Sequence, residues 1–234
     1  MASLPHLDIV ILWSITLLLQ AAMIWHSIAR LTRLYPIFLL WMAADLVYQA
    51  VMFVIYASPS PVSGDLFTRL WGTLEIGLAI MPVAACYESV RRVRKYQIET
   101  ILLATVVSAG IAWAVSRALG TPQHFSSSLE PAIRFKAFID LALFCVIIIL
   151  VESKPQAPRG AQKYSFALAG YFGAMAAVNF LSVYQMSYLG RARMAQILSA
   201  VVPGMFFLVM LIIFWGPPNR AGSLISNAGK VEEN

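Results

Sequence analysis

Three acidic residues interrupt apolar stretches of the sequence at positions where a charge is costly. Asp45, Glu75 and Asp140 each lie inside a stretch of the length that a transmembrane helix needs. An ionised side chain at the middle of a bilayer costs about 2.5–3.5 kcal/mol on insertion scales. Carboxyl groups in such positions can bind a cation, exchange a proton or join helices through hydrogen bonds. They are therefore the first candidates for function.

The composition explains why these stretches are interpreted as membrane-spanning. Of the 234 residues, 60% are hydrophobic and 12% are charged, whereas soluble domains carry roughly 25% charged residues. The net charge of +6 does not indicate nucleic-acid binding, because the basic residues lie in short links between apolar stretches. The sequence predicts an all-α polytopic membrane protein in contact with the lipid bilayer, with no nucleic-acid partner.

Seven segments are apolar and long enough to cross a bilayer. They lie at roughly 7–29, 35–57, 66–90, 98–118, 132–152, 164–189 and 194–215. No basic residue precedes the first segment, so it is interpreted as a retained helix and not as a signal peptide. We expect a single seven-helix transmembrane bundle over residues 1–216, followed by a short, disordered cytoplasmic tail at 217–234.

The distribution of Lys and Arg predicts that the N-terminus lies outside and the C-terminus in the cytoplasm. This orientation divides the 17 basic residues into 11 on the cytoplasmic side and 6 on the outer side, as the positive-inside rule requires. The densest cytoplasmic cluster consists of Arg91, Arg92, Arg94 and Lys95. It is interpreted as a positive-inside anchor, which can also attract anionic lipid head groups. The expected location is a bacterial cytoplasmic (inner) membrane.

On this topology the polar residues inside the spans fall at similar depths. At a rise of 1.5 Å per residue, the three acids lie about 12–18 Å below the outer ends of their helices. Gln20 and Asn179, on the first and sixth segments, lie at comparable heights. The predicted intramembrane polar layer consists of Asp45, Glu75, Asp140, Gln20 and Asn179.

Two interpretations of this layer are open. In the first, the carboxyl groups are neutral and form hydrogen bonds with polar side chains of neighbouring helices. In the second, the layer is a cation or proton site near the middle of the membrane. Lys136, four residues before Asp140, can lie one helical turn away from it and offset its charge. The segment that carries Asp45 has no basic residue.

Small residues recur at every fourth position of the fourth segment. Ala104, Ser108, Ala112 and Ser116 form one stripe on a helix, and such stripes let helix backbones approach closely. The stripe is expected to pack within the bundle or against another subunit, either a partner protein or a second copy of the chain.

The sequence contains no pattern typical of an enzyme or of a cofactor site. No metalloprotease, nucleophile-elbow or phosphate-loop motif occurs, and the last segment lacks the lysine that a retinal Schiff base needs. Cys86 and Cys145 both lie in apolar segments, so they are interpreted as packing residues and not as a disulfide. We expect a non-enzymatic protein without a metal or a cofactor.

Two stretches, LYPIFLLWMAADLV (34–47) and RLWGTLEIGLAIMPVAACYESV (69–90), resemble parts of bacterial seven-helix integral membrane proteins to which no activity is assigned. The shared features are an aromatic-Pro start of the second helix and a third helix with Trp71 and Glu75 one turn apart. The resemblance implies a fold and no mechanism.

Three functions are compatible with these features. The short loops, the missing catalytic motifs and the small-residue stripe favour a structural or interaction subunit of a membrane assembly. The alternative is a small cation- or proton-coupled solute transporter that uses Asp45, Glu75 and Asp140. The third is a sensor that needs a separate signalling partner, because the C-terminal tail is too short to form an output domain.

Overall fold

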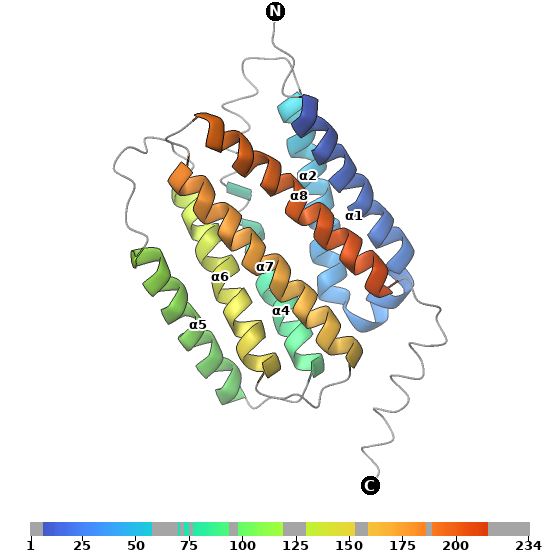
Figure 1. Ribbon diagram of the computed structural model, residues 1–234. Helices are drawn as coiled ribbons and strands as arrows, with labels where there is room; N and C mark the ends of the chain where they lie inside the picture. The colour runs from blue at the N-terminus through green and yellow to red at the C-terminus, as the bar shows by residue number, and fades with distance from the viewer. Residues whose placement is uncertain are drawn as a thin grey trace, which may run out of the picture.

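The described part of the chain is built from helices (Figure 1). The computed structural model describes residues 7–57, 70, 73–74, 77–93, 98–118, 130–152, 159–185 and 189–214, and no strand occurs among them. The all-α class is therefore confirmed for this part of the chain. The helices are α1 (Leu7–Leu34), α2 (Pro36–Ala57), α4 (Ile80–Val93), α5 (Ile98–Ala118), α6 (Glu130–Glu152), α7 (Arg159–Gln185) and α8 (Leu189–Phe214).

Within the described residues, four helices are long and apolar enough to cross a membrane. The spans are Leu7–Ala29 in α1, Pro36–Tyr56 in α2, Gln162–Ser182 in α7 and Ile197–Phe214 in α8. The first half of α6 carries Arg134, Lys136 and Asp140, and the apolar stretch of α5, Leu102–Val115, is shorter than these spans. The third predicted segment, 66–90, is described only in part. Four such helices are compatible with a membrane protein, whereas the seven-span count and the orientation stay predictions.

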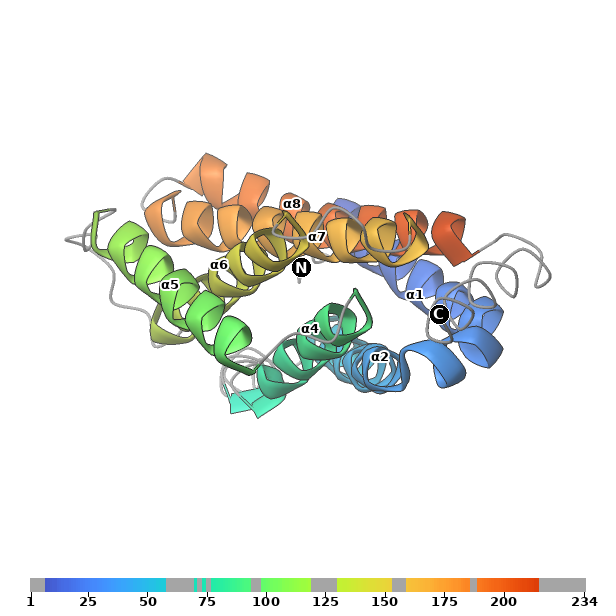
Figure 2. The same ribbon diagram turned by 90° about the horizontal axis from the view of Figure 1, so that it is seen from below.

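The helices run up and down and form a closed ring of neighbours (Figure 1). In the order α1, α2, α4, α6, α7, α8, each helix packs against the next, and α8 packs against α1. Seen from below, α7 and α8 lie on one side of the ring, and α2 and α4 lie on the other (Figure 2). The helix α5 lies at the edge of the molecule and packs against α6 (Figure 2). Side chains of α2, α4, α6 and α7 can therefore meet inside the ring.

The start of α2 is held by a side chain of another helix. Pro36 occupies the first position of α2, where its missing N–H leaves no donor unsatisfied. The backbone N–H groups of Ile37 and Phe38 donate to the two carboxylate oxygens of Glu88 on α4, at 3.2 and 2.9 Å. A carboxylate at a helix N-terminus also interacts favourably with the helix dipole. This contact fixes α2, which carries Asp45, relative to α4.

A close contact joins α1 to α8 at the turn where α8 contains Pro203. The Thr16 hydroxyl lies 2.9 Å from the carbonyl oxygen of Ala200 on α8 and 3.0 Å from that of Leu12 on its own helix. Gly204 makes this approach possible, because a Cβ atom at that position would lie 3.1 Å from Thr16 Oγ1. The contact thereby holds α1 and α8 together.

Aromatic side chains form the core of the ring next to the start of α2. Tyr35 stacks on Tyr164 with ring centroids 4.1 Å apart, and Tyr171 stacks on Phe206 at 4.4 Å. The cluster consists of Tyr35, Phe38, Trp41, Tyr164, Tyr171, Phe172, Phe206 and Phe214. Such pairs contribute about 0.5–1.5 kcal/mol each beyond the area that they bury. The cluster therefore gives the interior a rigid wall, which includes Trp41 and Tyr171.

The small-residue stripe of α5 is buried within the chain. Ala104, Ser108 and Ala112 are 3%, 0% and 0% exposed, and α5 packs against α6. The side chain of Ser116 lies outside the described part. These three side chains therefore pack within the chain, and a contact of this helix with another subunit stays a prediction. The outward face of α5 instead exposes apolar side chains such as Val106.

Candidate functional site

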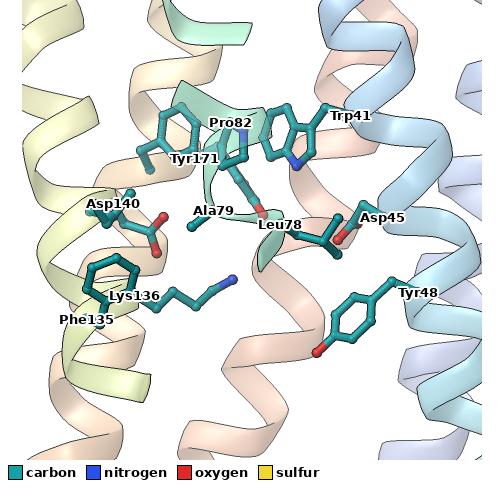
Figure 3. A pocket seen from close by; sticks show the side chains of 12 residues that line it. Trp41, Asp45, Tyr48, Leu78, Ala79, Pro82, Phe135, Lys136, Asp140 and Tyr171 are labelled. Atoms are coloured by element: carbon teal, nitrogen blue, oxygen red, sulfur yellow. The ribbon is translucent and has the colours of Figure 1, made fainter. Parts of the chain in front are cut away.

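A polar cavity lies inside the ring, next to the aromatic core (Figure 3). Its lining comes from α2, α6 and α7 and from the region around the start of α4. The lining residues are Trp41, Asp45, Tyr48, Leu78, Ala79, Pro82, Phe135, Lys136, Ile139, Asp140, Tyr171 and Phe172. The cavity volume is about 40 Å³, and roughly 10–15 Å³ on this measure holds one water molecule. About three water molecules or a small ion therefore fit, and a sugar-sized solute does not.

Asp45 enters the cavity from α2. Trp41, Asp45 and Tyr48 are spaced by four and three residues, so they share one face of the helix, and this face lines the cavity (Figure 3). Gln20 of α1 donates through Nε2 to Asp45 Oδ2 at 3.0 Å and to the backbone oxygen of Met42 at 2.9 Å. Because Gln20 is fully buried, these two contacts fix its amide group, which in turn orients the carboxyl group of Asp45.

Asp140 enters the cavity from α6, opposite Asp45 (Figure 3). It is 6% exposed, and its Oδ2 accepts a hydrogen bond of 3.0 Å from Nδ2 of Asn179 on α7. Lys136 precedes it by one helical turn, and the Lys136 side chain extends toward the middle of the cavity (Figure 3). The described lining thus brings two carboxyl groups from different helices and one ammonium group to the same small space.

The described lining carries ionisable groups of both signs. Asp45 and Asp140 contribute two carboxyl groups and Lys136 contributes one ammonium group. Gln20 and Asn179 donate from neutral amide groups, which orient the carboxyl groups without neutralising them. The interaction between such groups is strongest where the surroundings are apolar. The arrangement is suited to the exchange of a proton or a small cation through the few water molecules that fit.

The structure brings together four residues of the predicted polar layer. Gln20 pairs with Asp45 and Asn179 pairs with Asp140, and both carboxyl groups reach the same cavity. Glu75 lies outside the described residues. That these residues form a functional site stays a prediction.

The first two residues of the predicted basic cluster, Arg91 and Arg92, belong to the end of α4. Arg91 is exposed. The backbone of Arg92 belongs to α4, but its side chain lies outside the described part, as do the whole residues Arg94 and Lys95. The role of this cluster as an anchor or a head-group site stays a prediction.

Sequence reasoning missed two parts of this site. The first is the aromatic lining, although the spacing of Trp41 and Tyr48 around Asp45 could have indicated that all three share a face. The second is the position of Glu88, whose contact with α2 lies 50 residues away along the chain. No local pattern in the sequence predicts this contact, because it depends on which helices are neighbours.

Among the described residues, no group of three or more His, Cys, Asp or Glu side chains is placed to hold a metal ion. Comparisons of the chain with protein-family models, with curated proteins and with solved structures gave no match. The resemblance to bacterial seven-helix proteins gains no support from these comparisons. The geometry of the cavity is therefore the basis for a functional proposal.

Proposed function

We propose that this chain is a seven-helix protein of a bacterial cytoplasmic membrane, oriented N-out and C-in, and that it acts as a small cation- or proton-coupled transporter. The four long apolar helices support the membrane location, and the asymmetry of Lys and Arg supports the orientation. The observation that carries the functional part is the cavity of about 40 Å³ between Asp45 and Asp140, with Lys136 in its lining.

The cavity favours ion exchange over a purely structural role of the two acids. Both acids have an amide partner on a neighbouring helix, as acids that join helices do. Asp45 is only half-buried, and both carboxyl groups border a space that can hold water. Such a space gives a proton or a small cation access to the carboxyl oxygens.

In the proposed cycle, the site is loaded when a proton or a monovalent cation binds between Asp45 and Asp140. It is unloaded when the Lys136 ammonium becomes the counter-charge of Asp140, which lies four residues further along the same helix. Gln20 and Asn179 hold the carboxyl groups in place during both states. The electrochemical gradient of the bound proton or cation then drives a coupled solute, which this cavity is too small to hold.

Isosteric neutralisation of each acid tests this proposal. The variants Asp45→Asn and Asp140→Asn remove one charge each with little change in shape, and Glu152→Gln, at the exposed end of α6, is the matched control. In proteoliposomes that contain a pH-sensitive dye, both Asn variants are expected to lose cation-dependent proton flux, while Glu152→Gln keeps it. Size-exclusion elution as a single folded species shows that the loss is not caused by unfolding. Wild-type flux in both Asn variants would refute the proposal.

A structural or interaction subunit of a membrane assembly is the second proposal. Its support is the apolar outward face of α5, which includes Leu102, Leu103 and Val106 and which a partner helix or a second copy could cover. It predicts that other chains, or a second copy, co-purify in mild detergent. A monomer that carries cation flux alone would contradict it.

The third proposal, a sensor, uses the same cavity for detection and requires a signalling partner. All three proposals are non-enzymatic and need no resident metal or cofactor.

A further inference from the structure

Aromatic side chains form much of the wall of the cavity that Asp45 and Asp140 line. The described lining includes five of them, contributed by α2, α6 and α7: Trp41, Tyr48, Phe135, Tyr171 and Phe172. Three of these rings pack against one another. Phe172 stacks on Trp41 with ring centroids 5.8 Å apart, and the Tyr171 centroid lies 6.1 Å from that of Trp41 and 5.4 Å from that of Phe172. One side of the cavity is therefore a continuous aromatic wall, and aromatic faces attract cations.

The two carboxyl groups bring hydrogen-bond acceptors to the same space. Asp45 accepts from the Gln20 amide and Asp140 from the Asn179 amide, each at 3.0 Å. An ionised carboxyl group has about four acceptor positions, more than one amide group uses. A cation with N–H donors can bind such acceptors while its remaining surface contacts aromatic rings. An alkali cation instead needs oxygen atoms around it to replace its hydration shell, and an aromatic wall offers it carbon on one side.

The lining already holds one ammonium group, that of Lys136. This residue is half-buried, it lines the cavity, and its side chain extends toward the middle of the space (Figure 3). An ammonium group has donors only and no acceptor. The combination of carboxyl groups and aromatic rings therefore accommodates an ammonium group of the protein itself, and a free ammonium compound has the same chemistry.

The size of the cavity limits which ammonium compound fits. Its volume of about 40 Å³ corresponds to about three water molecules. The ammonium ion is about as large as a water molecule and methylammonium adds only a methyl group, so both fit. Tetramethylammonium, with a methyl group in place of every N–H, is too large and offers no donor to the carboxyl groups.

We propose that the cation that binds in this cavity is the ammonium ion or methylammonium, and that the Lys136 side chain is its tethered competitor. The ligand donates its N–H groups to Asp45 and Asp140 and packs against the aromatic wall. Lys136 withdraws from the carboxyl groups when the ligand binds. The inference rests on the proposed function for the role of the bound cation in transport, whereas binding itself is measured separately.

Competition at the wild-type protein tests the class of cation without any substitution. The full chain is purified in mild detergent, and equilibrium binding of radiolabelled methylammonium is measured by scintillation proximity. Unlabelled ammonium is expected to displace the label. Potassium has nearly the same radius but no N–H donors, so it should need a concentration at least about tenfold higher. Equal competition by potassium, or displacement by tetramethylammonium at the concentrations at which ammonium acts, would overturn the inference.

Two variants test the competitor and the aromatic wall. Lys136→Met keeps an unbranched side chain without the charge, and it should tighten methylammonium binding at least about threefold because the tethered competitor is gone. Tyr171→Leu removes one ring of the wall and should weaken binding at least about threefold. The matched control Lys163→Met, at an exposed position of α7, should bind like the wild type. Weaker binding in Lys136→Met, or unchanged binding in Tyr171→Leu, would overturn the inference.

These outcomes are distinguishable from those of the flux assay. Proton flux that depends on both acids, together with no methylammonium binding in the wild type or in Lys136→Met, would overturn the inference and leave the proposed function standing. Methylammonium binding that is lost in Asp45→Asn and Asp140→Asn, together with wild-type flux in both variants, would support the ammonium site and refute the proposed function.

Discussion

The contact between Glu88 and the start of α2 gives a quantitative prediction, because its two hydrogen bonds differ in burial. The bond from the Phe38 N–H, at 2.9 Å, is buried, and the bond from the Ile37 N–H, at 3.2 Å, is partly buried. A buried bond to a charged acceptor contributes about 1.5–3 kcal/mol, and a partly buried one about 0.5–1.5 kcal/mol. Glu88→Ala should therefore lower the free energy of unfolding by about 2–4 kcal/mol. Glu88→Gln keeps one oxygen acceptor and should lose about half as much.

Two assays measure this effect at different scales. The apparent melting temperature of the purified protein reports the global loss, which should follow the order wild type, Glu88→Gln, Glu88→Ala. Maleimide labelling of Cys86 in a Cys145→Ala background reports the local loss, because Cys86 is 2% exposed and lies on α4 two residues before Glu88. Labelling is expected to be slow in the wild type and faster when α4 is no longer tied to α2.

A matched control separates this contact from general removal of charge. Glu99→Gln changes an exposed acid in the first turn of α5 and should shift the free energy of unfolding by no more than about 0.5 kcal/mol. If Glu88→Ala melts at the wild-type temperature and leaves Cys86 unreactive, the proposed link between α2 and α4 is refuted.

The remaining stability predictions concern close packing and the amide partner of a buried acid. Gly204→Val should destabilise the protein by about 1–3 kcal/mol, because a Cβ atom would lie 3.1 Å from Thr16 Oγ1. The control Gly110→Val, where a Cβ atom would meet no atom within 4 Å, should melt near the wild-type temperature. Equal shifts in melting temperature for the two variants would contradict this account of the α1–α8 contact. Asn179→Leu should cost about 1–3 kcal/mol by leaving Asp140 without its amide donor, and the double variant with Asp140→Leu should recover part of the loss. An unchanged melting temperature for Asn179→Leu would show that the hydrogen bond contributes little.

The sequence predicted the helical class, and a simple physical reason allowed it to assign heights to the polar residues. Helix rise is constant, so a position in the chain converts directly into a depth. The fourth predicted segment, 98–118, has the same limits as α5, whereas α1 continues to Leu34, beyond the predicted end at residue 29. Apolar composition predicts which residues can lie in the hydrocarbon of the bilayer, and not where the helix ends. The helical hydrogen bonding continues through the polar residues that follow the apolar segment.

The sequence did not predict which helices are neighbours. Gln20 and Asn179 were assigned to the same layer, but their pairing with Asp45 and Asp140 depends on the rotation and order of the helices in the ring. The prediction made from the small-residue stripe on α5 was limited in the same way. The spacing of the stripe indicated close helix packing, but it could not distinguish α6 of the same chain from a helix of another subunit.

The most direct test of the account is whether Asp45 and Asp140 change protonation together when a cation binds. Infrared difference spectra of the reconstituted protein, recorded with and without a monovalent cation or across a pH step, report the carboxyl stretching bands. The account predicts a band change that is lost in both Asp45→Asn and Asp140→Asn and retained in Glu152→Gln, because the two acids share one cavity. A difference spectrum that is the same in the wild type and in both Asn variants would contradict it.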